Sequence, residues 1–392
     1  MTSRLATSAA DNIEEFKCCG CGACCWGWAV ELDEPSERVI LDHLAKAPHP
    51  IYGKEIPTRI AGPKKFLKTV DDHCVFLESN NRCYLHDNFG EKIKPFVCTV
   101  YPNRIAPTPG KTIVALSPSC HVAAGIIIKD KTQLFSKGEM DATLVAEPEP
   151  MELCNGIPLS EEETALLEIR IDQFLDEEDR SFPEKLMRTC QFLESLVETI
   201  QETSGSFVAA MNAIPSNNPE LTPPAVSEQL KILTSLLDHR QAIAEQTSCP
   251  SSLKKFFTLL NDTYSLNDSS ARPPAVIRYS RTLKNHFDTS ADKSACSFSN
   301  WARYHVKSRY FTRTFGFRDG INILCFLYTL VRATSAAIAS KNQSDVNDPI
   351  LADAISMVEQ QFTHSAIVLQ FWKSILDIPN ARKAWFLGRM VL

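Results

Sequence analysis

The chain has 392 residues, of which 44% are hydrophobic and 22% charged, and its formal net charge at pH 7 is −6. This length predicts two domains, and the composition is typical of a soluble globular protein. The mildly acidic balance argues against general nucleic-acid binding. The stretch "MTSRLATSAADNIEEF" has no apolar core and carries Asp11, Glu14 and Glu15. It therefore does not resemble a secretory or transit leader, and we expect a cytoplasmic protein.

Short strands, turns and brief helices are predicted for about the first 125 residues. "AVELDE" alternates like a strand, and "PSERVILDHLAKA" reads as an amphipathic helix with Pro35 and Ser36 in its first turn. "HCVFLESNNRCYLH" predicts two short strands around the turn at residues 79–81, "DNFGEKIKPFVC" a helix cap at Asp87, and "KTIVALS" another strand. Such a loop-rich region has little apolar core, so a metal crosslink would help it fold.

Helices dominate the sequence after about Lys129. "PLSEEETALLEIRIDQFL" begins with Ser160, followed three residues later by Glu163, which is a capping pattern before an apolar helical repeat. The apolar segment Ile321–Val331 is too short to span a bilayer and is expected to be a buried core helix. Further helices are predicted at about residues 182–203, 224–246, 250–264, 275–287, 298–313, 320–341, 347–363 and 365–376.

These patterns predict an α+β fold in two parts. Residues 1–128 are expected to form a small, loop-rich, cysteine-cluster metal-binding domain. Residues 129–392 are expected to form a larger, all-helical domain. No membrane span is expected in either part.

Charge is unevenly distributed in the helical part. Residues 141–203 hold seventeen acidic and four basic residues, which is typical of solvated helix faces. In contrast, "RYHVKSRYFTRTFGFR" has five basic residues and no acid, with spacings of four that place some of them on one helix face. Their long stems either cover apolar surface or form a site for an anion or an acidic partner. Arg309 and Arg313 are the candidates for contacting a cofactor.

The cysteines are concentrated in the first domain. Nine of fourteen lie in the first 120 residues, and five of these fall in "FKCCGCGACCWGW". In a reducing cytosol such clustered thiols bind metal or carry out redox chemistry, and disulfides remain an alternative only for a chain exported by another route. Cys18, Cys21, Cys24 and Cys25 form C-x-x-C-x-x-C-C, with Cys19 as an additional thiol. This spacing brings sulfurs to chelating distance and is also used to hold iron–sulfur clusters.

Four more cysteines follow in "CVFLESNNRC", "VCTVYP" and "SPSC". Each alone would be an ordinary buried thiol, but together with the first motif they make eight thiolates. Eight thiolates fill two tetrahedral zinc sites, or one 4Fe–4S cluster with four left over. The neighbouring His73, His86 and His121 are either substitute ligands or surface histidines. The predicted metal ligands are Cys18, Cys21, Cys24, Cys25, Cys74, Cys83, Cys98 and Cys120.

These motifs resemble the cysteine-cluster proteins with a zinc- or iron-chelating domain, and within them the flagellin lysine N-methylases. "CCWGWAVELD", "CTVYPNR" and "LSPSCHVAAGIII" are similar to that group's double cysteine with Gly-Trp, its "CxxYPR"-like segment and its "LSC" before a helix. "WARYHVKSRYFTRTFGFRDGINILCFLYTLV" and "VEQQFTHSAIVLQFW" are similar to its helical region. Cys19, Asn103 and the Pro118-Ser119 pair depart from the family pattern.

The resemblance implies a protein lysine N-methyltransferase that uses S-adenosylmethionine on flagellin or another protein and carries an iron–sulfur centre. Such a transfer needs a neutral, desolvated lysine. Trp26 and Trp28 are candidates for holding the sulfonium by cation–π contact, and Tyr84 and Tyr101 for a catalytic role; alternatively, these aromatics only shield the metal from solvent. No G-x-G-x-x-G follows a strand, so no Rossmann-type loop is expected. The alternative function is a non-enzymatic iron- or zinc-chelating protein whose helices bind a partner.

Overall fold

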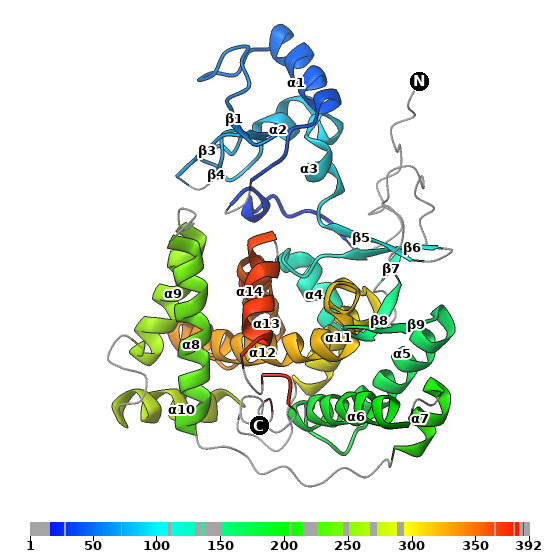
Figure 1. Cartoon of the computed structure of the whole chain (residues 1–392). Coiled ribbons are helices and arrows are strands. Elements are labelled where there is room, and N and C mark those ends of the chain that lie inside the picture. The colour runs from blue at the N-terminus through cyan, green and yellow to red at the C-terminus, as the bar shows by residue number, and fades with distance from the viewer. Residues whose placement is uncertain are drawn as a thin grey trace.

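The computed structural model describes residues 16–26, 29–71, 73–108, 111–129, 135–136, 150–203, 206–214, 226–245, 251–266, 273–287, 294–363, 366–378, 381–383 and 387. Figure 1 shows a small lobe of short elements above a larger body of long helices. Among the described residues, one hydrophobic core lies between Val30 and Leu85 and a larger one between Ala115 and Leu387. We refer to residues 16–101 as the cysteine lobe, residues 102–136 as the connecting segment and residues 150–387 as the helical body. The predicted α+β class, with a cysteine-rich part before a helical part, is confirmed.

The cysteine lobe contains short helices and two-stranded antiparallel hairpins. Its α1 (Glu34–Lys46) begins as predicted, because Asp33 caps it by accepting a hydrogen bond from the Ser36 N–H at 2.8 Å. The strand predicted in "AVELDE" is reduced to a single antiparallel bridge between Glu31 and Phe66. The other elements of the lobe are η2 (Ala23–Cys25), β1 (Thr58–Ala61), β2 (Lys64–Leu67), β3 (Thr69–Val70), β4 (His73–Cys74), α2 (Tyr84–Phe89), η3 (Glu91–Ile93) and α3 (Phe96–Val100).

Two local predictions for the lobe were wrong. Residues 73–86 do not form two strands around the turn. Strand β4 pairs instead with β3, which precedes it in the chain, and a single bridge between Leu77 and Cys83 spans the turn. The chain then enters α2 at Tyr84, so Asp87 lies inside a helix rather than at its cap. Cys83 occupies the N-cap position of α2, and its side chain makes no capping hydrogen bond.

A three-stranded antiparallel sheet connects the lobe to the body. It has the order β5 (Asn103–Thr108), β6 (Lys111–Leu116) and β7 (Phe135–Ser136), and β6 confirms the strand predicted in "KTIVALS". The following α4 (His121–Lys129) packs against α11 (Ala295–Lys307) and α13 (Asp348–Phe362). Although most of α4 lies within the predicted first domain, residues 1–128, its buried side chains thus belong to the larger core.

The helical body begins with the β8–β9 hairpin (Met151–Cys154 and Ile157–Leu159). This hairpin was missed, although Asn155-Gly156 between apolar residues is a strong hairpin signal and Gly156 has φ +85°. Ser160 and Glu163 form the predicted capping box of α5 (Glu161–Leu175). Most of the remaining helices lie close to their predicted ranges: α6 (Phe182–Thr203), α8 (Val226–Glu245), α9 (Ser251–Tyr264), α10 (Pro273–Phe287) and α14 (Ala366–Leu376). Helix α7 (Phe207–Ala213) was not predicted. The break predicted between residues 313 and 320 was wrong, because α11 ends at Lys307 and α12 (Tyr310–Asn342) begins at Tyr310.

The central helix of the body is α12, which packs against α6, α9, α10, α11, α13 and β8. It kinks at Gly316, where φ is +80° and an added Cβ would lie 3.0 Å from the Cys154 Cα. This glycine lets β8 pack directly on the helix. By length and composition α12 is the one described helix able to cross a membrane, but 89% of its apolar window is buried inside the molecule. The segment Ile321–Val331 is therefore the buried core helix that the sequence predicted.

Candidate metal centre

The cysteine loop, residues 16–26, runs from the body to the lobe. Phe16 packs against the larger core, and Cys25 packs against the smaller one. Gly20 and Gly22 have φ of +66° and +71°, a left-handed conformation that L side chains rarely adopt. A Cβ on Gly22 would also lie 2.6 Å from the Asn81 carbonyl oxygen. Glycine at 22 thus lets the loop lie directly on the 78–82 turn.

Three further cysteines reach the same place from separate elements. Cys74 ends β4, Cys83 precedes α2, and Cys98 lies in α3. The turn between the first two is closed by backbone hydrogen bonds from Glu78 N–H to Arg82 O at 2.9 Å and from Tyr84 N–H to Phe76 O at 2.7 Å. The backbone therefore fixes where these thiols lie relative to the cysteine loop.

Together these segments enclose a cavity of about 420 Å³. Its wall contains Lys94 and Tyr101 as well as apolar side chains such as Phe76 and Leu85. Five of its thiols, which we call the inner cysteines, interact with one another electrostatically. The inner cysteines are Cys24, Cys25, Cys74, Cys83 and Cys98. Cys18 and Cys19 also line the cavity.

Burial controls the charge of the inner cysteines. It raises the pKa of Cys74 to about 12 and also raises the pKa of Cys83 and Cys98, so these thiols are neutral at pH 7. Cys24 differs, because a hydrogen bond from the Cys25 thiol and the charge of Lys94 lower its pKa to about 7 against the effect of burial. A bound cation would release the remaining protons, since metal ligation requires the thiolate.

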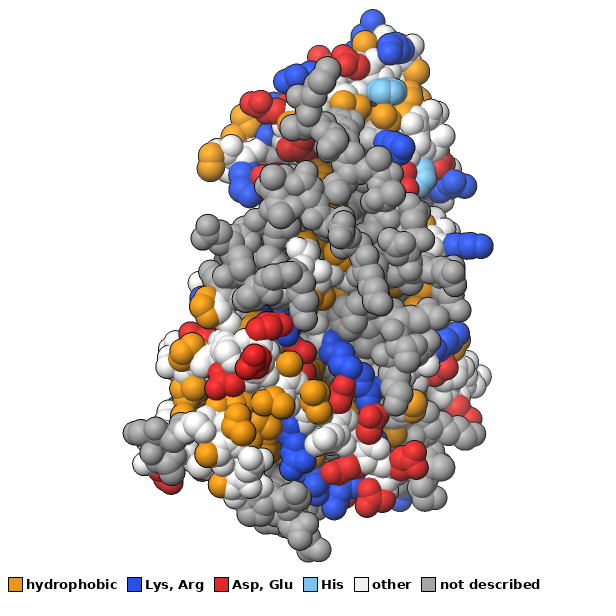
Figure 2. All heavy atoms as spheres, turned by 90° about the vertical axis from the view of Figure 1, so that its right-hand side faces the viewer, with side chains coloured by type: hydrophobic (Ala, Val, Ile, Leu, Met, Phe, Trp, Pro, Cys, Tyr) orange, Lys and Arg blue, Asp and Glu red, His pale blue; other side chains and the backbone are white. Residues whose placement is uncertain are grey.

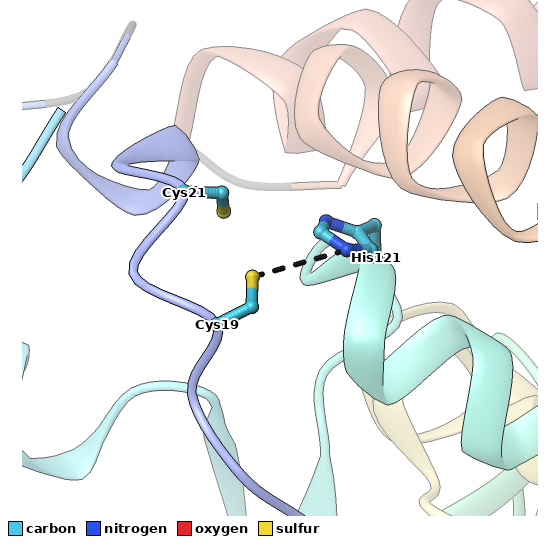
Figure 3. Close-up of side chains that lie close together, drawn as sticks. All are labelled: Cys19, Cys21 and His121. Carbon is cyan, nitrogen blue, oxygen red and sulfur yellow. Dashed lines mark hydrogen bonds between the residues drawn. The ribbon is translucent and has the colours of Figure 1, made fainter. Parts of the chain in front are cut away.

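A second group of ligand atoms lies beside the cavity. Cys19 and Cys21 from the cysteine loop point toward His121, the first residue of α4 (Figure 3). Their two sulfurs and one imidazole nitrogen all lie within 4.8 Å of one another. Among the described residues, no other group of three or more ligand atoms is as compact. Of the predicted ligands, Cys21 and Cys120 do not line the cavity. Burial raises the pKa of Cys120 to about 11, against the opposing effect of the nearby backbone N–H groups of Ala123 and Val122.

The predicted aromatic residues lie in different surroundings. Tyr101 lines the cavity, and its hydroxyl shares a hydrogen bond with Ser119 Oγ at 3.3 Å. Burial raises the pKa of Tyr101, so its phenol stays protonated at neutral pH. Tyr84 is buried in the lobe core and donates a hydrogen bond to Pro48 O at 3.3 Å. Trp26 packs against His73. The ammonium of Lys255, on α9, lies over the Trp26 ring, 4.9 Å from its centroid. Trp28 lies outside the described residues.

The basic segment 303–318 pairs with acids of α5. Arg303 contacts Asp172 at 2.8 Å and Asp176 at 2.6 Å. Arg309, 1% exposed, contacts Glu161 at 2.9 Å and Glu168 at 2.7 Å. Two arginines of the basic segment thus pair with four acids of the acidic segment. On the face shown in Figure 2, acidic and basic side chains accordingly lie interspersed.

Of the two arginines proposed to contact a cofactor, Arg309 has its guanidinium engaged by these carboxylates, and Arg313 is half-buried on α12. Neither lines the cysteine cavity. Their predicted role in cofactor binding therefore stays a prediction.

Sequence reasoning missed a buried polar network between the connecting sheet and the body. Arg104, on β5, donates to Thr363 Oγ1 at 2.8 Å and lies 4.0 Å from the ring centroid of Tyr310. It also approaches Glu359 at 3.5 Å, and Glu359 accepts a hydrogen bond from His305 Nε2 at 2.6 Å. His305 and Arg104 lower the pKa of Glu359 to about 2, although burial alone would raise it. No local pattern signals this network, because its members come from four separate elements.

Comparison with known protein families matches two parts of the chain. Residues 17–121 match CxxCxxCC, described as a candidate zinc- or iron-chelating domain. Residues 165–384, more than half of the chain, match the FliB lysine N-methylase C-terminal domain. No curated protein and no solved structure matched the chain. The chain therefore carries a cysteine-cluster chelating domain and belongs to the FliB lysine N-methylase C-terminal domain family.

Proposed function

We propose that this protein is a lysine N-methyltransferase that transfers a methyl group from S-adenosylmethionine to a protein in the cytoplasm, with flagellin as the first candidate substrate. The family of residues 165–384 supports the reaction, and the family of residues 17–121 supports a bound metal. The observation that carries the proposal is the position of the cysteine cavity beside a body of the methylase family. Cys19 in the cavity wall reaches His121 of α4, which packs against α11 and α13 of that body.

The inner cysteines fit an iron–sulfur cluster better than a single ion. A tetrahedral zinc ion with Zn–S bonds of about 2.3 Å holds its sulfurs about 3.8 Å apart, whereas a cluster distributes its thiolates over several iron atoms. Within the described residues, no three of the inner cysteines have ligand atoms that all lie within 4.8 Å of one another. They nevertheless surround one cavity. Four of the five would hold a 4Fe–4S cluster, which when bound supplies a crosslink for the lobe and one-electron chemistry.

The side chains around the cavity suggest how the protein would prepare the reacting groups. Methyl transfer requires a lysine that has lost its proton and is shielded from water. Tyr101 remains a neutral phenol, so it would orient a group by hydrogen bonding rather than accept the lysine proton. Trp26 already carries one cation, Lys255, near its ring, which supports its proposed role in contacting the sulfonium or the substrate ammonium.

Two measurements on the whole chain test the proposal. After anaerobic purification, iron and acid-labile sulfide should be present together, and Cys74→Ser should lose most of both. Cys296→Ser removes an exposed thiol of α11 outside the centre and should leave them unchanged. Incubation with labelled S-adenosylmethionine and flagellin should then yield N-methyl-lysine, identified by mass spectrometry of the substrate.

The two measurements can fail separately. A colourless protein with stoichiometric zinc and no sulfide would contradict the cluster but not the methyl transfer. A protein that contains iron but transfers no methyl group to flagellin or to any other protein lysine would contradict the enzyme. That outcome would favour a non-enzymatic chelating protein whose helical body binds a partner.

A further inference from the structure

We propose that Cys19, Cys21 and His121 form a second metal site, separate from the inner cysteines, for one divalent ion of the zinc class. Cys19 Sγ lies 3.9 Å from His121 Nε2, and all three ligand atoms lie within 4.8 Å of one another (Figure 3). Bonds of about 2.0–2.3 Å to a tetrahedral zinc ion separate such ligands by about 3.5–3.8 Å. Small side-chain rotations therefore close this group around one ion.

The ligand set is distinct from that of the inner centre. Cys19 lines the cavity of the inner cysteines but is additional to C-x-x-C-x-x-C-C, and Cys21 does not line that cavity. Two thiolates and one imidazole form a mixed sulfur and nitrogen set, which suits zinc. The spacing of this group matches a single ion, whereas the inner cysteines are spread more widely.

Neighbouring residues are placed to complete and orient the site. Cys120 directly precedes His121, interacts electrostatically with Cys21, and is the candidate for the fourth ligand. On α13, Asp353 interacts electrostatically with His121. A carboxylate near a ligating histidine is the usual device that orients the ring. Cys120 is not among the three atoms that already lie within 4.8 Å of one another, so it would have to move toward them to serve as the fourth ligand.

The position of the site suggests what the ion would do. Cys19 and Cys21 belong to the cysteine loop, whereas His121 begins α4, which packs between α11 and α13 of the body. An ion there would attach the cysteine loop to the body beside the contact already made by Phe16. The second site would therefore fix the position of the cysteine lobe relative to the helical body.

Counting zinc and iron separately tests the site. The whole chain is purified anaerobically from zinc-supplemented medium, and both metals are measured by mass spectrometry. We expect the wild type to hold about one zinc ion per chain more than Cys19→Ser and His121→Ala, with equal iron in all three. Cys296→Ser and His43→Ala are matched controls outside the site and should keep both metals. In protein loaded with Co²⁺ in place of zinc, the thiolate-to-cobalt absorption band should be lost in the two site variants only.

Two results would overturn the proposal. Equal zinc in the wild type and both site variants, with far-UV circular dichroism showing that all are folded, would mean that these residues hold no ion. A parallel loss of iron in both variants would assign them to the inner centre instead. Because no methyl transfer is measured, failure of the second site leaves the proposed enzyme untouched, and failure of the enzyme leaves the zinc count unaffected.

Discussion

Replacing Glu359 by glutamine tests whether the buried network holds the connecting sheet to the helical body. Glu359 is 0% exposed and accepts hydrogen bonds from His305 Nε2 at 2.6 Å and Trp301 Nε1 at 3.2 Å. Its second oxygen lies 3.5 Å from Arg104 Nη2. The substitution keeps the shape of the side chain but removes the charge, which leaves the guanidinium of Arg104 buried without its carboxylate.

Two arguments give similar magnitudes for the loss of stability. Removing one partner of a buried ion pair costs about 3–5 kcal/mol. The pKa of Glu359 falls from its ordinary 4.5 to about 2, and at about 1.4 kcal/mol for each pH unit this corresponds to about 3 kcal/mol. We therefore expect Glu359→Gln to lower the free energy of unfolding at pH 7 by about 3–4 kcal/mol.

The pH dependence provides a second readout. The folded carboxyl binds its proton less readily than the unfolded one, so its contribution to stability is fully present above about pH 4.5 and is lost as the pH falls toward about 2. The difference in stability between wild type and variant should therefore shrink as the pH falls through this window.

Urea unfolding followed by far-UV circular dichroism measures both effects. Glu162→Gln, an exposed carboxylate of α5, is the matched control and should change stability by less than about 0.5 kcal/mol. If Glu359→Gln is as stable as this control at pH 7, the network does not connect the parts as we argue. A difference that stays constant between pH 7 and pH 3 would refute the ionic explanation in particular.

Three further substitutions test two close backbone contacts at glycines and one arginine–aromatic contact, and each glycine variant has a second glycine as its control. Gly22→Ala should lower metal content several-fold because its Cβ overlaps backbone, whereas Gly20→Ala carries only the backbone strain of about 1–2 kcal/mol and should retain metal; equal metal content in both variants would contradict this. Gly316→Ala should lower the free energy of unfolding in urea by about 2–4 kcal/mol. Gly156→Ala, which has open space around it, should lower it by about 1–2 kcal/mol. Equal losses of stability in the two variants would disprove the close approach of Gly316 to β8. Arg104→Lys should cost about 1–3 kcal/mol, seen as a lower thermal midpoint, because lysine cannot reproduce the planar contact with Tyr310; an unchanged midpoint would count against that contact.

Local sequence signals predicted the helices well. Ser160 and Glu163 are three residues apart, so the capping box that they form requires no knowledge of the rest of the fold. The same holds for α1, whose first turn contains Pro35 and Ser36. The crowding of cysteines in the first 120 residues likewise pointed to a metal centre before any geometry was known.

Long-range pairing could not be predicted. Arg303 and Asp172 are 131 residues apart, and neither charge pattern identified the other as its partner. Cys19 and His121 are 102 residues apart and meet only because α4 docks on the body. A spacing rule finds ligands within one loop, but it cannot show which distant side chain completes the group.

The order of the inner cysteines along the chain has a consequence for biogenesis. All five lie between Cys24 and Cys98, so every thiol of the inner centre has been synthesised before translation reaches the helical body. Domains generally fold during synthesis from the N-terminus onward. Cofactor insertion could thus begin on the ribosome, whereas docking of α4 must wait for α11 and α13, which are translated about 170 or more residues later.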